Sequence, residues 1–129
     1  MTRLPISVCI VAGNEAHRIR AALDGVKDWT SEIILAIDDK VTDGTDKIAE
    51  GYGAKVFSQP WRGHAGHRNF ASSHATQPWL LAIDADEVVS EKLRDEIVEA
   101  FQSHAAKSAP AAYSFPRLSF FCGRWIRHG

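Results

Sequence analysis

Cysteine and long hydrophobic runs are both scarce in this chain of 129 residues. Its two cysteines, Cys9 and Cys122, do not form a Cys-x-x-Cys pair, and nothing in their placement indicates a disulfide framework. The apolar run 6–12 is too short to span a bilayer, and the polar pair Asn14-Glu15 follows it closely. We therefore expect a reduced, cytoplasmic protein without a transmembrane segment of its own.

An excess of either charge is also lacking, because 15 Lys and Arg residues balance 16 Asp and Glu residues. This balance argues against a surface that binds nucleic acid and against a polybasic membrane patch. A peripheral contact with the inner face of the membrane is compatible with the last residues, but Arg124, Arg127 and His128 are too few to predict it. The length corresponds to one domain, 1–129, and the sequence leaves the oligomeric state open.

Hydrophobic patterning predicts strands that alternate with helices. Apolar runs indicate strands at 6–12, 32–37, 54–57 and 79–83, with one or two more in 113–121. Apolar residues at helical spacing, together with capping and stop signals, indicate helices at 19–26, from 42–45 to 51, at 67–75 and at 90–101. Asn14 and either Thr42 or Asp43 are the expected caps of the first two helices, and the turn-rich segments 58–66 and 109–112 are expected to be loops.

This alternation predicts right-handed βαβ units and a mainly parallel sheet, which is an α/β fold. In such sheets, ligands bind in the crevice at the carboxyl ends of the strands. Polar segments lie at three of these ends: Asn14-Glu15, Asp38-Asp39 and Asp84-Ala85-Asp86. We therefore expect one acidic crevice.

The pair Asp84 and Asp86 follows the apolar run 79–83 at a spacing of two residues. In an extended backbone, side chains two apart project to the same side, so we expect both carboxylates to converge on one object. Mg²⁺ and Mn²⁺ prefer carboxylate oxygens, and substrate phosphates often fill their other positions. With Asp38-Asp39 nearby, the pattern predicts a site for a divalent cation and a phosphorylated ligand.

Three motifs occur in a familiar order: Ile6-Ser7-Val8 through Gly13-Asn14-Glu15, Asp38 through Thr42-Asp43-Gly44-Thr45, and Asp84-Ala85-Asp86. In this order the chain resembles the nucleotide-sugar-binding half of a family-two glycosyltransferase with the GT-A fold. The Arg68-Asn69 pair also fits. Within that family the chain is most similar to lipopolysaccharide core glucosyltransferases, because Gln59-Pro60-Trp61 precedes the Arg-Asn pair.

The resemblance implies a Rossmann-like nucleotide-diphospho-sugar transferase fold and a binding role for residues after the first two strands. In similar enzymes, the acidic residue after the first strand and the Asp that ends the second strand hold the base and the ribose. Here these residues are Glu15 and Asp38, and Asn14 and Asp39 lie beside them in the same motifs.

The resemblance also implies roles for the residues of the third motif. In similar enzymes, the first Asp of this DxD motif lies near the ribose and the second binds the metal on the diphosphate. These positions are Asp84 and Asp86, so both are candidate metal residues. Arg68 is expected to add a cationic contact to phosphate or base.

The implied function is metal-assisted, inverting transfer of a sugar from a nucleotide-diphosphate sugar, expected to be a UDP-sugar, to a hydroxyl group. The acceptor would be a glycan or a lipid-linked molecule in the assembly of lipopolysaccharide or another cell-envelope glycan. Bound Mg²⁺ or Mn²⁺ would neutralise the charge of the leaving nucleoside diphosphate.

The chain departs from the family pattern in two places. Asp39, Lys40 and Val41 replace the Ser-Gly-Ser that usually follows the second strand. Inverting members also need a carboxylate base well after the DxD motif, whereas this sequence has no Asp or Glu after Glu99. We therefore assign no catalytic residue and expect the chain to hold the nucleotide-sugar-binding half, with the acceptor-binding half largely missing.

The candidate residues also have ordinary structural explanations. Acids at the end of a strand can be solvated or can close a turn, which applies to both aspartate pairs. Glu15 is favoured near a helix start by the helix dipole, and Arg68 can be a solvated helix residue. The spacing of the three histidines within 64–74 matches no zinc pattern.

Two other functions stay open. The chain can be a nucleotide-sugar-binding fragment without turnover, which the missing downstream carboxylate favours. Asp84-x-Asp86-x-Val88 also resembles the nucleophile motif of haloacid-dehalogenase-type phosphatases, in which the first Asp attacks phosphate. That motif normally ends the first strand of its fold, whereas three expected strands precede it here.

Overall fold

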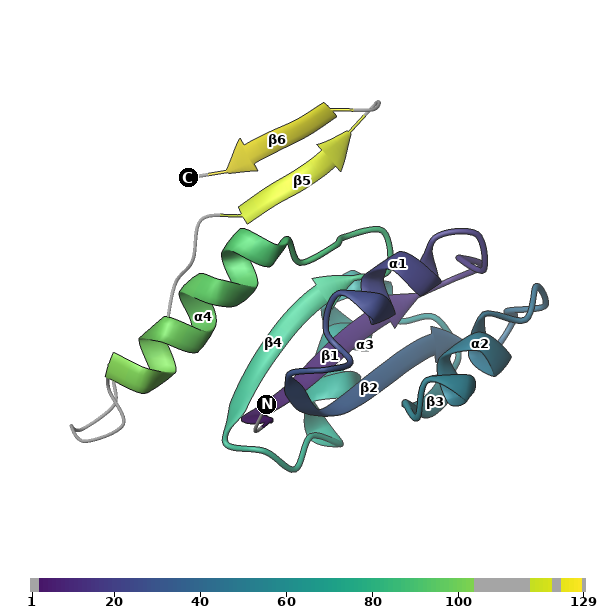
Figure 1. The fold of residues 1–129 in the computed structure, drawn as a ribbon. Coiled ribbons are helices and arrows are strands. Elements are labelled where there is room, and N and C mark those ends of the chain that lie inside the picture. The colour runs from purple at the N-terminus through teal and green to yellow at the C-terminus, as the bar shows by residue number, and fades with distance from the viewer. Residues whose placement is uncertain (1–2, 104–116, 122–123, 129) are drawn as a thin grey trace.

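A four-stranded parallel sheet forms the centre of the protein (Figure 1). The computed structural model describes residues 3–103, 117–121 and 124–128. The strand order is β3-β2-β1-β4, from β1 (Leu4–Ala12), β2 (Thr30–Asp38), β3 (Lys55–Gln59) and β4 (Trp79–Asp84). All three strand pairs are parallel, so the predicted parallel α/β sheet is confirmed. β5 (Arg117–Phe121) and β6 (Arg124–His128) form a separate antiparallel pair.

Helices cover both faces of the parallel sheet. They are α1 (Ile19–Asp24), α2 (Thr45–Gly51), α3 (Gly63–Ser73) and α4 (Glu91–Ser103). The larger core cluster joins one face of the sheet to α1, α2 and α4, and the smaller one joins the other face to α3. Figure 1 accordingly shows α1 in front of the sheet and α3 behind it, with α4 beside β4.

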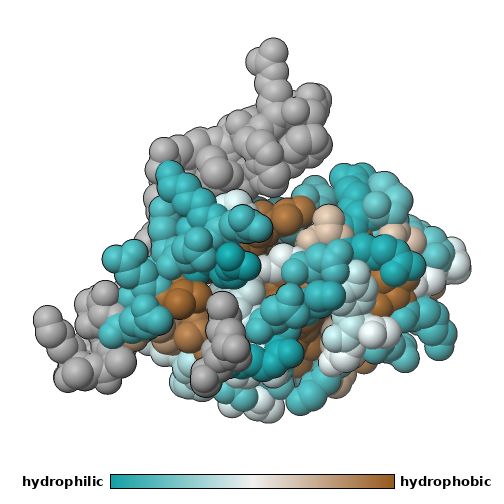
Figure 2. Space-filling model, in the orientation of Figure 1, coloured by the Kyte–Doolittle hydropathy of each residue, from teal (hydrophilic) through white to brown (hydrophobic). Residues whose placement is uncertain are grey.

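The burial of β1 and β4 reflects their places in the sheet, with β1 inside and β4 at one side. Every residue of β1 from Ile6 to Ala12 is buried, as expected for a parallel strand covered on both faces. In β4, by contrast, Leu80 is 51% exposed on the face that carries α3. On the side of the molecule that Figure 2 shows, hydrophobic residues form separate patches among hydrophilic ones.

The third helix differs from the prediction. We expected a loop over 58–66 and a helix from 67, but β3 continues to Gln59 and α3 already begins at Gly63. Gly63 has a φ of 79°, a left-handed conformation that glycine adopts without strain. Gly66 lies inside the helix, where a Cβ would come within 2.7 Å of the Cβ of Arg62. These two glycines therefore serve the helix start and its packing, whereas composition alone indicates a loop.

Two of the expected helix caps are also wrong. α1 begins at Ile19 with Arg18 at the N-cap position, four residues beyond Asn14. The N-cap of α2 is Gly44, with a φ of 89°. The Asp43 carboxylate instead accepts a hydrogen bond from the amide of Thr45, the first residue of the helix. Ser90 precedes α4, and its hydroxyl accepts a hydrogen bond from the Leu93 amide at 3.1 Å.

Near the end of the chain, β5 confirms a strand within 113–121, while 109–112 and 113–116 lie outside the described residues. The second strand of this pair, β6, begins beyond the range in which we expected it. None of the helices in the described part of the chain has the length and apolar character needed to cross a membrane.

Candidate functional site

The carboxyl ends of β1, β2 and β4 lie at one edge of the sheet. The register pairs Ala12 with Ile37 and Val11 with Asp84, so the loops 13–18, 39–44 and 85–90 leave the sheet at neighbouring points. The polar segments that the sequence places after these strands therefore meet at this edge.

Asn14 joins the loop after β1 to the loop after β2. Its side-chain oxygen accepts hydrogen bonds from the backbone amides of Thr42 at 3.0 Å and Asp43 at 3.3 Å. The Asn14 side chain therefore has a positioning role between two loops.

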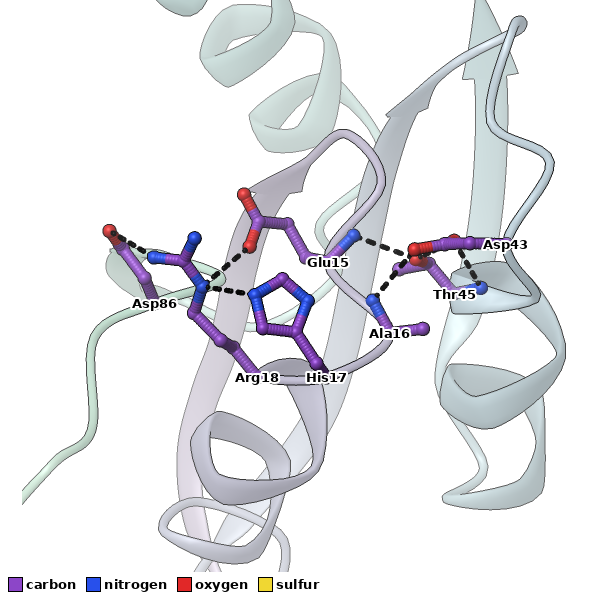
Figure 3. Close-up of polar contacts among 7 residues, drawn as sticks. All are labelled: Glu15, Ala16, His17, Arg18, Asp43, Thr45 and Asp86. Carbon is purple, nitrogen blue, oxygen red and sulfur yellow. Dashed lines mark hydrogen bonds and ion pairs between the residues drawn. The ribbon is translucent and has the colours of Figure 1, made fainter.

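Asp43 makes a second connection between the same loops (Figure 3). One carboxylate oxygen accepts a hydrogen bond from the Ala16 amide at 3.0 Å, and the other accepts from the Thr45 amide and hydroxyl. The buried Thr45 hydroxyl in turn accepts a hydrogen bond from the Glu15 amide at 3.0 Å. The hydrogen bonds from the Thr45 hydroxyl and the Ala16 amide hold the pKa of Asp43 below its ordinary value.

Glu15 and Asp86 lie on either side of one guanidinium group, that of Arg18 (Figure 3). Arg18 Nε is 3.3 Å from Oε2 of Glu15, and Arg18 Nη1 is 3.8 Å from Oδ2 of Asp86. The same Nε–H donates a hydrogen bond to Nε2 of His17 at 2.8 Å. Because Glu15 follows β1 and Asp86 follows β4, Arg18 connects two of the three loops at the edge.

Asp84 has a different arginine as its partner. Nη2 of Arg68, on α3, donates a hydrogen bond to Oδ1 of Asp84 at 3.2 Å. β4 ends at Asp84, and a turn closed by the hydrogen bond from the Glu87 amide to the Asp84 carbonyl (2.9 Å) follows. The extended geometry that we expected over 84–86 is therefore absent, and the two carboxylates contact different cations.

Asp38 and Asp39 start the turn that follows β2. The Asp38 carboxylate accepts a hydrogen bond from the Lys40 amide at 3.1 Å, and the Asp39 amide donates one to the carbonyl of Gln59 at 3.0 Å. Along β2, Ile34 and Ala36 pack toward α3, so alternation places Asp38 on the same side. Asp38 thus closes a turn, which is the structural explanation expected for it as an alternative to ligand binding.

The acidic residues of the edge are therefore divided between the two faces of the sheet. Asp38 and Asp84 lie on the side of α3, whereas Asp86 reaches Arg18 at the start of α1. An elongated ligand that crosses the edge can contact both groups, whereas a single ion cannot be expected to hold all of them.

His67 supports the end of β2 from α3. Its ring is fully buried, Nδ1 accepts a hydrogen bond from the Arg62 amide at 3.3 Å, and Nε2 lies 3.1 Å from the carbonyl of Ile37. Since Nδ1 is an acceptor, the proton of the neutral ring is on Nε2, which donates to Ile37. His67 thereby fixes the backbone immediately before Asp38.

The donor atoms at this edge suit a hard divalent cation that shares its coordination with phosphate. Among the described residues, no three His, Cys, Asp or Glu side chains form a preformed metal cluster. Asp86 is half-exposed and only weakly paired, so its carboxylate oxygens are accessible. Mg²⁺ in particular is commonly held by one or two carboxylates together with substrate phosphates.

Sequence reasoning missed three residues of this edge. Arg18 is three positions after Glu15, which is an ion-pair spacing on a helical turn, and this signal could have identified it. Glu87 closes the turn after β4, because its carboxylate accepts a hydrogen bond from the Asp84 amide at 2.8 Å. His67 could not have been recognised, since its partner Ile37 is 30 positions away.

Sequence comparison finds relatives that are glycosyltransferases. An uncharacterized glycosyltransferase of Rickettsia felis is 46% identical over 99 residues, which cover 77% of this chain and 35% of that protein. The lipopolysaccharide core biosynthesis glycosyltransferase LpsC of Rhizobium meliloti is 32% identical over 102 residues, which cover 75% of this chain and 37% of LpsC. The chain thus spans about a third of the length of these relatives.

Solved structures share the fold. Staphylococcus aureus TarS, residues 1–349 in complex with UDP-GlcNAc, superposes with a TM-score of 0.63 at 21% identity, over 81% of this chain and 32% of that chain. Glucosyl-3-phosphoglycerate synthase from Mycobacterium tuberculosis, in complex with Mn²⁺, UDP and phosphoglyceric acid, superposes with a TM-score of 0.58 at 23% identity, over 80% of this chain and 39% of that chain. These likenesses establish the GT-A type of fold.

The family model for glycosyl transferase family 2 matches residues 7–121, which is most of the chain. This match argues against the phosphatase alternative. The position of the Asp84 motif argues against it too, because the motif ends the fourth strand along the chain rather than the first. The chain belongs to glycosyltransferase family 2.

Proposed function

We propose that this chain is the nucleotide-sugar-binding domain of a glycosyltransferase that transfers a sugar to a hydroxyl acceptor in lipopolysaccharide or related envelope-glycan assembly. The observation that carries the proposal is the meeting of Glu15, Asp38, Asp84 and Asp86 at one edge of a sheet of this family. The relative LpsC, named for lipopolysaccharide core biosynthesis, supports the choice of pathway.

The donor would lie across the edge, from the α3 side to the α1 side. Asp38 and Glu15 would hold the base and ribose, with Asn14 and Asp39 shaping the same loops, and Asp84 would lie near the ribose. Asp38 on the α3 side and Glu15 on the α1 side would contact this part of the donor from the two faces of the sheet. A UDP-sugar is the donor that we favour, because both structural neighbours described above were solved with UDP or a UDP-sugar.

The diphosphate would lie toward Asp86, on the α1 side of the edge. Asp86 is the residue that would hold Mg²⁺ or Mn²⁺, with Asp84 close by, and the Mn²⁺ in one structural neighbour supports this assignment. When bound, the cation would supply Lewis-acid stabilisation of the nucleoside diphosphate leaving group. Arg68 adds a guanidinium that can donate hydrogen bonds to a phosphate or a base.

The transfer that we propose is a direct displacement with inversion at the anomeric carbon. Such a reaction needs a carboxylate base for the acceptor hydroxyl, and the sequence has no Asp or Glu after Glu99. Because the relatives are about three times as long as the matched region, we assign the base and the acceptor site to a part of the protein beyond this domain.

Calorimetry with UDP in the presence and absence of Mn²⁺ tests the proposal. The wild type is expected to bind UDP in a metal-dependent manner, and Asp86→Ala is expected to lose that dependence. Asp95→Ala is the matched control, because Asp95 is an exposed acid on α4. Failure of the wild type to bind any nucleotide or nucleotide sugar with Mn²⁺ present would contradict the proposal.

A second candidate function, donor binding without turnover by this chain, is favoured by the missing downstream carboxylate. An assay of UDP release from UDP-sugars distinguishes the two. Release above background by the wild type, absent from Asp86→Ala, would rule out the inert fragment.

A further inference from the structure

Arg18 is a cation placed between two loops of the proposed donor site. Its guanidinium lies between Glu15, which follows β1, and Asp86, which follows β4 (Figure 3). The family resemblance implies binding roles for the acids at this edge but none for Arg18.

The contact with Glu15 is the inner of the two. Oε2 of Glu15 is buried and has no hydrogen-bond partner among the described residues, while Arg18 Nε lies 3.3 Å away. A buried carboxylate oxygen needs a nearby positive charge, because desolvation of an uncompensated charge is costly. His17 also accepts the Nε–H of Arg18. The Nε edge of the guanidinium is therefore held in place.

The contact with Asp86 is the outer one and is much weaker. The distance of 3.8 Å exceeds that of a hydrogen bond, and the side chains of Arg18 and Asp86 are 52% and 49% exposed. Exposed pairs of this kind contribute little, so Asp86 can exchange its partner readily. A divalent cation is a stronger partner for a carboxylate, and Asp86 is the residue that we propose to hold it.

We propose that Arg18 is a further donor-binding residue, which neutralises Asp86 in the free protein and contacts the donor diphosphate once Asp86 has bound the cation. Its Nε edge stays with Glu15 and His17, and its Nη1 exchanges the carboxylate of Asp86 for a phosphate oxygen. This inference rests on the proposed function, because it assigns a residue to the diphosphate end of that site.

The proposal has two consequences of opposite sign. In the absence of nucleotide, Arg18 competes with the cation for Asp86, so its removal should strengthen cation binding. In the presence of nucleotide, Arg18 donates charge-assisted hydrogen bonds to phosphate, so its removal should weaken nucleotide binding. A residue with only a structural role would not move the two affinities in opposite directions.

The test uses Arg18→Met, which keeps the apolar stem and removes the charge. The matched control is Arg20→Met, because Arg20 is an exposed arginine two residues further on, in the first turn of α1. Free Mn²⁺ is measured by electron paramagnetic resonance without nucleotide, and UDP binding is measured by calorimetry at saturating Mn²⁺. Arg18→Met is expected to bind Mn²⁺ about two- to fivefold more tightly and UDP about tenfold more weakly, with no change in the control.

Asp86→Asn provides the second variant. Adding Arg18→Met to Asp86→Asn should leave the residual Mn²⁺ affinity unchanged, because the carboxylate for which Arg18 and the cation compete is already absent. An effect of Arg18→Met that persists in this background would overturn the proposal, as would equal Mn²⁺ affinities of Arg18→Met and Arg20→Met in the native background. A wild type that binds neither Mn²⁺ nor UDP contradicts the proposed function itself, whereas normal binding of both by Arg18→Met contradicts only the role of Arg18.

Discussion

Two arginines on opposite faces of the sheet contact the two aspartates of the Asp84-Ala85-Asp86 segment. Arg68 belongs to α3 and pairs with Asp84, whereas Arg18 precedes α1 and lies near Asp86. All four side chains are at least one-third exposed, so each pair contributes at most about 1 kcal/mol to the free energy of folding. These residues are therefore suited to exchanging partners with a ligand rather than to stabilising the fold.

At the scale of single residues, we expect Arg68→Gln to weaken nucleotide binding while leaving the stability of the fold almost unchanged. Loss of the guanidinium is expected to weaken UDP binding about tenfold, because hydrogen bonds from a charged donor are stronger than neutral ones. The free energy of unfolding should change by less than about 1 kcal/mol, since the pair with Asp84 is partly exposed. Calorimetry and urea denaturation measure the two quantities.

Arg94→Gln is the matched control for Arg68→Gln. Arg94 also pairs with a neighbouring acid, Asp95, at 3.3 Å, but it lies on α4. The variant Arg94→Gln should therefore leave UDP binding unchanged. Equal loss of UDP affinity in both variants would mean that the effect is one of general charge and would count against a specific role of Arg68.

At the scale of elements, Glu32 connects the amino-terminal ends of the sheet. It lies at the start of β2, and its side chain is only 8% exposed. Its carboxylate accepts hydrogen bonds from the Ser7 hydroxyl of β1 at 2.5 Å, from Lys55 of β3 at 2.9 Å, and from the Thr76 amide before β4 at 2.6 Å. One carboxylate thus joins three strands and the segment that leads into the fourth.

This network makes the stability of the fold depend on pH. Burial alone would raise the pKa of Glu32, but the hydrogen bonds from Ser7, Thr76 and Lys55 outweigh it and lower the pKa from 4.5 to about 2. Because the ionised form is favoured by folding, its contribution is complete above about pH 4.5 and is lost as the pH falls toward 2. We expect urea denaturation midpoints to fall over this range.

The variant Glu32→Gln should remove that pH dependence in part and lower the free energy of unfolding at pH 7 by about 1–3 kcal/mol. Glu96→Gln, an exposed position on α4, is the control and should change little. A Glu32→Gln protein as stable as the wild type at pH 7 would show that the network does not stabilise the sheet.

The elements also show where hydrophobic patterning succeeds. It predicts β1, β2 and β4 to within a few residues, because buried parallel strands are continuous apolar runs. It places the start of α3 four residues late, since Gly63 and Gly66 are typical of loops in isolation. Their helical role depends on the left-handed φ of Gly63 and on the close approach of Gly66 to Arg62, neither of which composition records.

At the scale of the whole molecule, Cys9 should report global opening. It lies in β1 between β2 and β4, is 2% exposed, and packs toward α3. Burial raises the pKa of its thiol to about 11, despite a hydrogen bond with Ser72. Both exposure and the reactive thiolate are therefore suppressed in the folded protein.

The measurement is alkylation by iodoacetamide at pH 8 in a Cys122→Ser background. We expect Cys9 to react only as the chain unfolds, so that its modification follows the loss of circular dichroism across a urea titration. A free thiol model compound gives the unprotected rate. Alkylation of the native protein at that rate would mean that the sheet opens locally around β1.

The amino-acid sequence by itself determined the α/β class, the strand runs and the polar segments at the strand ends, since these follow from local hydrophobic periodicity and from residue type. Only the tertiary structure decided how those segments are used. Asn14 and Asp43 join two loops, Asp84 turns to α3, and Asp86 lies near Arg18. The physical reason is that strand alternation determines side-chain direction only while the backbone is extended. Beyond Asp84 the chain turns, and the partners are then set by packing between segments far apart in sequence.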